Sequence, residues 1–131
     1  MKVIAVDYGS ARTGVAVSDP TGTIARPLGV VEGAGRDAGL RRLVELIREE
    51  EPERVVVGLP LTLRGERGEQ ATETERFVEA LTDVISVPVV TYDERFTTDL
   101  AEQAPSDEPE DARAAAHLLS SYLTWTSGAG A

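Results

Sequence analysis

The chain has 131 residues, enough for one domain with a single hydrophobic core, and its hydrophobic content of 41% is that of an ordinary globular protein. The absence of cysteine excludes a disulfide framework, a cysteine-based zinc site and thiol catalysis. Because 23 acidic residues oppose 13 basic ones, the net charge is −10, and binding of nucleic acid would require a local basic patch or metal ions.

The first three predicted elements are short strands. Residues 3–7 form an apolar run that reaches Asp7 too early for a signal peptide, and no run of 18 apolar residues follows, so we expect a cytoplasmic protein. A second strand over residues 14–18 follows after a short link, which favours a hairpin. A turn then leads to a third strand over residues 23–31, in which Pro27 indicates an edge position because proline lacks an amide donor.

The spacing of the apolar residues then changes to that of a helix. Leucine, valine and isoleucine recur on one helical face over residues 40–47, and Pro52 ends this helix. The apolar run at residues 55–60 has the length of a central parallel strand. The remaining predicted elements are a helix over residues 69–82, a strand over 87–92, a short helix from Thr97, a last helix over 110–125 with Trp125 anchored on the core, and a disordered tail over 127–131.

This order, three strands followed by helix, strand, helix, strand and helix, predicts the fold class. It favours an α/β domain over residues 1–126 of the ribonuclease-H-like type: a five-stranded mixed sheet of order 3-2-1-4-5 with the second strand antiparallel and helices on both faces. A flavodoxin-like sheet would need a helix between the first two strands, and the residues available there are too few.

Acidic residues lie at the predicted strand ends. Asp7 ends the first strand and Glu94 follows the fifth, so that one intervening strand separates them by roughly 10 Å at the ~4.8 Å strand spacing. Asp111, at the start of the last helix, could add a third carboxylate. Three such oxygen donors suit Mg²⁺ or Mn²⁺, and two ions can support phosphodiester hydrolysis. Each acid alone could instead be a turn residue, an ion-pair partner of Arg95 or a helix-start acid.

Four segments together carry a resemblance to a known family. They are Val-Asp-Tyr-Gly with Arg-Thr-Gly-Val-Ala at residues 6–16, Ala-Arg-Pro-Leu at 25–28, Val-Gly-Leu-Pro-Leu at 57–61 and Asp-Glu-Arg-Phe-Thr-Thr at 93–98. In this order and at this spacing they resemble the YqgF family, whose members are described as Holliday-junction-resolvase-like proteins and pre-16S ribosomal RNA nucleases. The resemblance covers about residues 1–125, including an alanine-rich last helix.

The resemblance implies a cytoplasmic bacterial nuclease with a ribonuclease-H-like fold that matures the 5′ end of 16S rRNA. Its substrate would be structured RNA, the pre-16S rRNA, or branched DNA. The family's metal-binding and catalytic acids fall on Asp7, Glu94 and Asp111, with Mg²⁺ or Mn²⁺ as the cofactor.

The resemblance also places arginines beside these acids. Arg12 and Arg95 fall on family positions where they could hold phosphate oxygens, and Arg64 and Arg67 in a glycine-punctuated loop are further candidates for phosphate contact. Residues 98–111 depart from the family pattern, because they hold six acids and no base where family members carry a longer basic segment. Contacts with nucleic acid must therefore come from these arginines.

Three functions remain open from the sequence. A metal-dependent nuclease acting on structured RNA is the leading hypothesis, with a Holliday-junction-resolvase-like DNA nuclease as a variant of it. A non-catalytic binding or regulatory module would be consistent with the missing basic segment. A small nucleotide-binding protein is the third hypothesis, based on the fold shared with actin-like ATPases, which is weak evidence.

Overall fold

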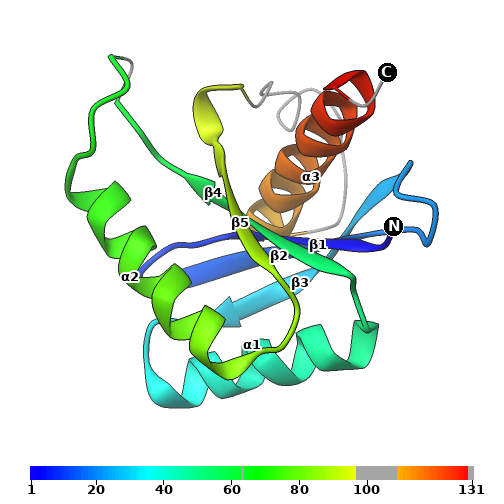
Figure 1. Cartoon of the computed structure of the whole chain (residues 1–131). Helices are drawn as coiled ribbons and strands as arrows, with labels where there is room; N and C mark the ends of the chain where they lie inside the picture. The colour runs from blue at the N-terminus through cyan, green and yellow to red at the C-terminus, as the bar shows by residue number, and fades with distance from the viewer. Residues whose placement is uncertain (63, 97–108, 130–131) are drawn as a thin grey trace.

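A single sheet with helices on both faces forms the centre of the protein (Figure 1). The computed structural model describes residues 1–62, 64–96 and 109–129. The elements in chain order are β1 (Val3–Asp7), β2 (Arg12–Ser18), β3 (Ala25–Glu32), α1 (Asp37–Glu50), β4 (Arg54–Leu59), α2 (Glu69–Val84), β5 (Val89–Asp93), the short 3₁₀ helix η1 (Glu94–Phe96) and α3 (Glu110–Ala129).

The strand order is β3-β2-β1-β4-β5, with β2 antiparallel to its neighbours and β1, β4 and β5 parallel to one another. The predicted ribonuclease-H-like sheet is therefore confirmed, including its edge strand β3, where Pro27 pairs with Ala16 at an irregularity in the ladder. The carboxyl ends of the three parallel strands meet at one edge of the sheet, which is where ligands bind in open α/β sheets.

Alternation along β1 divides the core into two layers. Ile4 and Val6 point to the face that α1 and α2 cover, and Val3 and Ala5 point to the face that α3 covers. All four side chains are at most 2% exposed, and burial of one large apolar side chain contributes about 1.5–3 kcal/mol. Central parallel strands need helices on both faces, and these two layers supply them.

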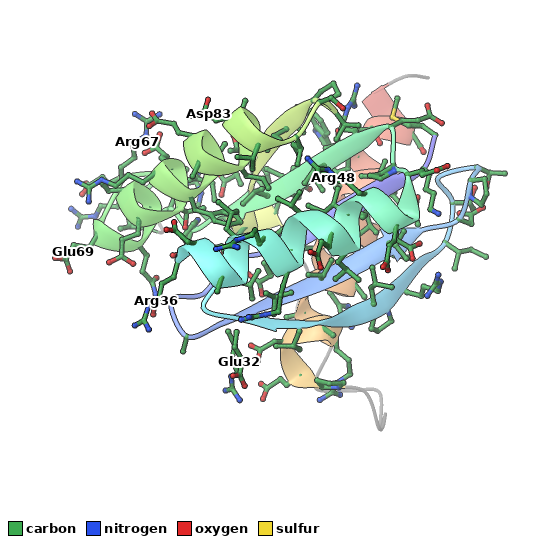
Figure 2. All side chains as sticks on the ribbon, turned by 90° about the horizontal axis from the view of Figure 1, so that it is seen from below. Glu32, Arg36, Arg48, Arg67, Glu69 and Asp83 are labelled. Atoms are coloured by element: carbon green, nitrogen blue, oxygen red, sulfur yellow. The ribbon has the colours of Figure 1, made fainter. Side chains whose placement is uncertain are left out.

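Helices α1 and α2 lie side by side on the first face (Figure 2). Near the end of α1, the Nη2 atom of Arg48 donates a hydrogen bond of 3.3 Å to the carbonyl oxygen of Val84, the last residue of α2. Helix α1 ends as predicted before Pro52, because Glu51 takes a left-handed conformation with φ of 50° and proline cannot continue a helix.

Several predicted element bounds were wrong: β2 begins at Arg12, two residues early, and β5 covers Val89–Asp93 in place of residues 87–92. Strand β3 begins at Ala25 because the carboxylate of Asp19 accepts hydrogen bonds from the amides of Thr23 and Ile24, at 2.8 Å each, and holds them in the turn. Helix α3 continues to Ala129, so residues 127–129 are helical and do not belong to a disordered tail. The predicted short helix from Thr97 and residues 130–131 lie outside the described residues.

Two further findings concern His117 and the composition of the helices. His117 is half-buried in α3. Within the described part of the chain, no helix combines the length and the apolar composition needed to cross a membrane.

Candidate active site

The side chains of Asp7 and Glu94 meet at the carboxyl edge of the sheet. Asp7 is the last residue of β1, and Glu94 begins η1 directly after β5. A hydrogen bond joins their carboxyl groups across the end of the intervening strand β4. Gly58 of β4 makes this contact possible, since a Cβ atom there would lie 2.5 Å from Oε1 and 2.9 Å from Cγ of Glu94.

The electrostatics of this pair follow from burial and like charge. Burial raises the pKa of Glu94 to about 7, and the neighbouring charge of Asp7 and their hydrogen bond add to the effect. Burial also raises the pKa of Asp7, although its hydrogen bond with Glu94 opposes this. One proton shared between the two carboxyl groups relieves the repulsion between them. A cation is the other species that can relieve the repulsion between two such groups.

Asp111 reaches the same edge from α3, the helix that covers the face to which Val3 and Ala5 of β1 point. It lies in the first turn of α3, and its backbone packs directly on Gly14, where any Cβ atom would collide with the Asp111 carbonyl group. Gly14 is the residue of β2 that pairs with Asp7. The charge of Asp111 further raises the pKa of Asp7, and its carboxylate forms an ion pair of 3.3 Å with Nε of Arg12.

The three predicted acids therefore do not form a single tight group. Among the residues that the structure describes, no three acidic or histidine side chains are close enough together to hold a metal ion. Asp7 and Glu94 are in direct contact, whereas Asp111 is within electrostatic range and is paired with Arg12. The donors present are all carboxylate oxygens, the set that suits Mg²⁺ or Mn²⁺.

A pocket of about 200 Å³ lies beside the carboxyl pair. Its walls come from the ends of β1, β4 and β5 and from the first turns of α2. The lining residues are Asp7, Tyr8, Gly9, Ser10, Pro60, Gln70, Glu73, Thr74 and Glu94. A second pocket of about 420 Å³ lies between the loop that precedes α2 and residues Glu94 and Arg95. Pro60, Gln70 and Glu94 border both pockets.

The contribution of α2 was not predicted from the sequence. Gln70 and Glu73 line the first pocket, and each lies four residues before a buried residue of α2, Thr74 and Phe77. The polar pair therefore continues the buried face of the helix by one turn toward the site. Polar residues that occupy the next positions of a buried helical face are the signal in the sequence that could have identified them.

Three of the four arginines that were predicted to contact phosphate lie beside an acidic residue. Arg12 pairs with Asp111, Nε of Arg67 lies 3.5 Å from Glu75, and Nε of Arg95 donates to Asp93 at 2.9 Å. These hydrogen bonds from Arg95 hold the pKa of Asp93 below its usual value. The side chain of Arg67 projects outward near the start of α2 (Figure 2). Arg64 is exposed in the same loop.

The fold is similar to the folds of two resolvases of known structure. The protein superposes on T. thermophilus RuvC in complex with a Holliday junction substrate with a TM-score of 0.59 and 21% identity, covering 98% of this chain and 96% of that one. Fowlpox virus resolvase bound to Holliday junction DNA gives a TM-score of 0.53 and 12% identity, covering 99% and 98%. At these identities the likeness concerns the fold alone.

Relatives in sequence are closer. A protein of Roseiflexus sp. (strain RS-1) named "Putative pre-16S rRNA nuclease" is 43% identical over 86% of this chain and 82% of its own length. One of Chloroflexus aggregans with the same name is 40% identical over 92% of each. Residues 1–125 match the family model RuvX, described as Holliday junction resolvase. The chain therefore belongs to the RuvX (YqgF) family, as the four sequence segments indicate.

Proposed function

We propose that this protein is a metal-dependent nuclease that hydrolyses phosphodiester bonds of pre-16S rRNA during 5′-end maturation in the cytoplasm. The observation that carries the proposal is the half-buried Asp7–Glu94 carboxyl pair at the carboxyl edge of the sheet. Family membership and the names of the relatives support the class of reaction and the substrate.

The residues present fit a divalent cation. Asp7 and Glu94 are two half-buried carboxyl groups in contact, and together they carry a proton that a cation can replace. With Asp111 at electrostatic range, they would hold one or two Mg²⁺ or Mn²⁺ ions. Such ions supply an activated water and stabilise the leaving oxygen in phosphodiester hydrolysis.

The protein's own groups set the protonation state of the site and position the substrate. Without a metal, a pKa of about 7 lets Glu94 populate both protonation states near neutral pH, and a cation held by the pair would take the place of its proton. Arg12 and Arg95 adjoin the acids and present donors for phosphate oxygens. Gly14 and Gly58 let Asp111 and Glu94 approach the sheet edge.

Cleavage of branched DNA is a second candidate function. The description of the matching family as Holliday junction resolvase favours it, and the same carboxyl pair would serve it. A junction substrate therefore belongs in the same assay as the RNA.

The test is cleavage of an end-labelled precursor of the 16S rRNA 5′ region and of a synthetic four-way DNA junction, with Mg²⁺ or Mn²⁺. We expect the wild type to cut the RNA and the Asp7→Asn variant to have lost cleavage. Asp37→Asn, a change of an exposed acid in the first turn of α1, should cut like the wild type. Cutting of the junction alone would favour the second candidate, and cutting of neither would favour a non-catalytic binding module.

A further inference from the structure

Two exposed aromatic rings pack on Tyr92, the residue of β5 that lies two positions before Glu94. Phe96, two residues after Glu94, is 62% exposed, and Trp125 of α3 is 56% exposed. Their rings lie on the ring of buried Tyr92, with centroid distances of 6.2 Å for Phe96 and 5.9 Å for Trp125. Trp125 therefore contacts the core through Tyr92 and Tyr122, as expected, but more than half of its surface remains in contact with solvent.

The packed elements beneath hold these rings in place. The hydroxyl of Ser121 in α3 donates a 2.9 Å hydrogen bond to the carbonyl oxygen of Phe96. The hydroxyl of Tyr92 lies 2.9 Å from the same Ser121 oxygen, to which it therefore donates. The ring of Tyr122 meets that of Tyr92 edge-on at 5.6 Å. These contacts hold η1, which contains Glu94 and Phe96, against α3 and β5.

The charges around the site explain why aromatic rings would contribute to binding of nucleic acid. The chain has a net charge of −10, and Arg12, Arg67 and Arg95 each share their charge with a neighbouring acid. Attraction to phosphates is therefore weak, whereas stacking of bases on aromatic rings does not depend on net charge. The guanidinium of Arg95 lies 5.8 Å from the Phe96 ring centroid and places a cation beside this apolar surface.

We propose that Phe96 and Trp125 form a stacking surface for unpaired bases of the nucleic acid strand whose phosphate is cut at Asp7 and Glu94. The proposal rests on the proposed function and names the form of its substrate, a strand that is single-stranded next to the cleaved bond. Aromatic rings bind any base by its flat face, but they cannot reach bases that are stacked within a duplex. The surface therefore selects single strands over blunt duplexes without reading sequence.

The experiment uses Trp125 as the probe, because it is the only tryptophan of the chain. Wild-type protein in EDTA is titrated with a single-stranded RNA, with a blunt duplex of equal length and with an abasic strand of equal charge. We expect the single strand to quench the fluorescence of Trp125, and the other two to leave it unchanged. Phe96→Ala should weaken binding of the single strand about tenfold. Phe96→Leu, which keeps an apolar side chain and loses the flat ring, should act in the same direction.

Ile24→Ala is the matched control, because Ile24 is 68% exposed in the turn between β2 and β3 and lies outside the site. It should bind like the wild type. Equal quenching by the abasic strand or the duplex, no quenching by the single strand, or unchanged affinity of both Phe96 variants would overturn the proposal. Cleavage without quenching would leave the proposed nuclease standing and remove the stacking surface. Quenching without cleavage would contradict the proposed nuclease activity and leave the stacking surface standing.

Discussion

A hydrogen bond joins the carboxyl groups of Asp7 and Glu94 across the end of β4, although β1, which ends in Asp7, and β5, which precedes Glu94, are not neighbouring strands. Two structural features allow this contact. Gly58 leaves the space above β4 open, and burial raises the pKa of Glu94 to about 7, so that a proton is available at neutral pH. The site is thus prepared for either a shared proton or a cation.

The first prediction concerns pH. Because the pKa of Glu94 is about 7 in the folded protein and 4.5 ordinarily, the folded state binds more protons between these values, and the free energy of unfolding falls as pH rises through them. In EDTA, the melting temperature should therefore fall from pH 5 to pH 8. Glu94→Gln should flatten this dependence, whereas Glu79→Gln on the exposed face of α2 should keep it. An equally steep profile for the Glu94 variant would contradict the assignment.

The second prediction concerns divalent cations. At pH 8, millimolar Mg²⁺ or Mn²⁺ should raise the melting temperature more than KCl at equal ionic strength, because ions that bind only the folded state stabilise it. Occupancy at a hundredfold excess over Kd contributes about 2.7 kcal/mol. Asp7→Asn should remove the difference between the two salts. If the variant and the wild type respond alike, the ions bind elsewhere.

The third prediction concerns Gly14. Gly14→Ala should lower the free energy of unfolding by about 1–3 kcal/mol, because the new methyl group meets the backbone of Asp111 and the first turn of α3 must shift. Gly29→Ala in β3, where no atom lies within 4 Å of the added Cβ, should change stability by no more than about 0.5 kcal/mol. Urea unfolding of both variants measures the contrast, and equal stabilities would show that α3 does not rest on Gly14.

The fourth prediction concerns Gly58. Gly58→Ala should displace the side chain of Glu94 from Asp7, since the added Cβ would lie 2.5 Å from Oε1 of Glu94. Cleavage and the stabilisation by Mn²⁺ should both fall, while the far-ultraviolet circular dichroism remains that of the wild type. Gly29→Ala serves again as the control. Full activity of the Gly58 variant would mean that Glu94 functions in another position.

The fifth prediction concerns Arg12. Arg12→Ala should weaken binding of RNA and flatten its salt dependence by about one unit, the effect of losing one phosphate contact. Stability should change by less than about 1 kcal/mol, because the ion pair with Asp111 is exposed. Arg26, which is equally exposed and paired with Glu50 at the other end of the sheet, is the matched control. Filter binding across a salt series would reveal an unchanged slope if Arg12 has no phosphate contact.

The sequence alone determined the topology and the position of the acids along the chain. The period of the apolar residues is local, and the rules for connecting strands leave few arrangements, so the order β3-β2-β1-β4-β5 could be predicted with Asp7 and Glu94 at the same sheet edge.

Only the tertiary structure decided how the side chains meet. The contact of Asp7 with Glu94 depends on the space above Gly58, and the pairing of Asp111 with Arg12 depends on how closely α3 packs on β2. The exposure of Trp125 depends on which rings already cover Tyr92. These contacts join residues distant in the chain, and their geometry follows from packing, which no local sequence pattern records.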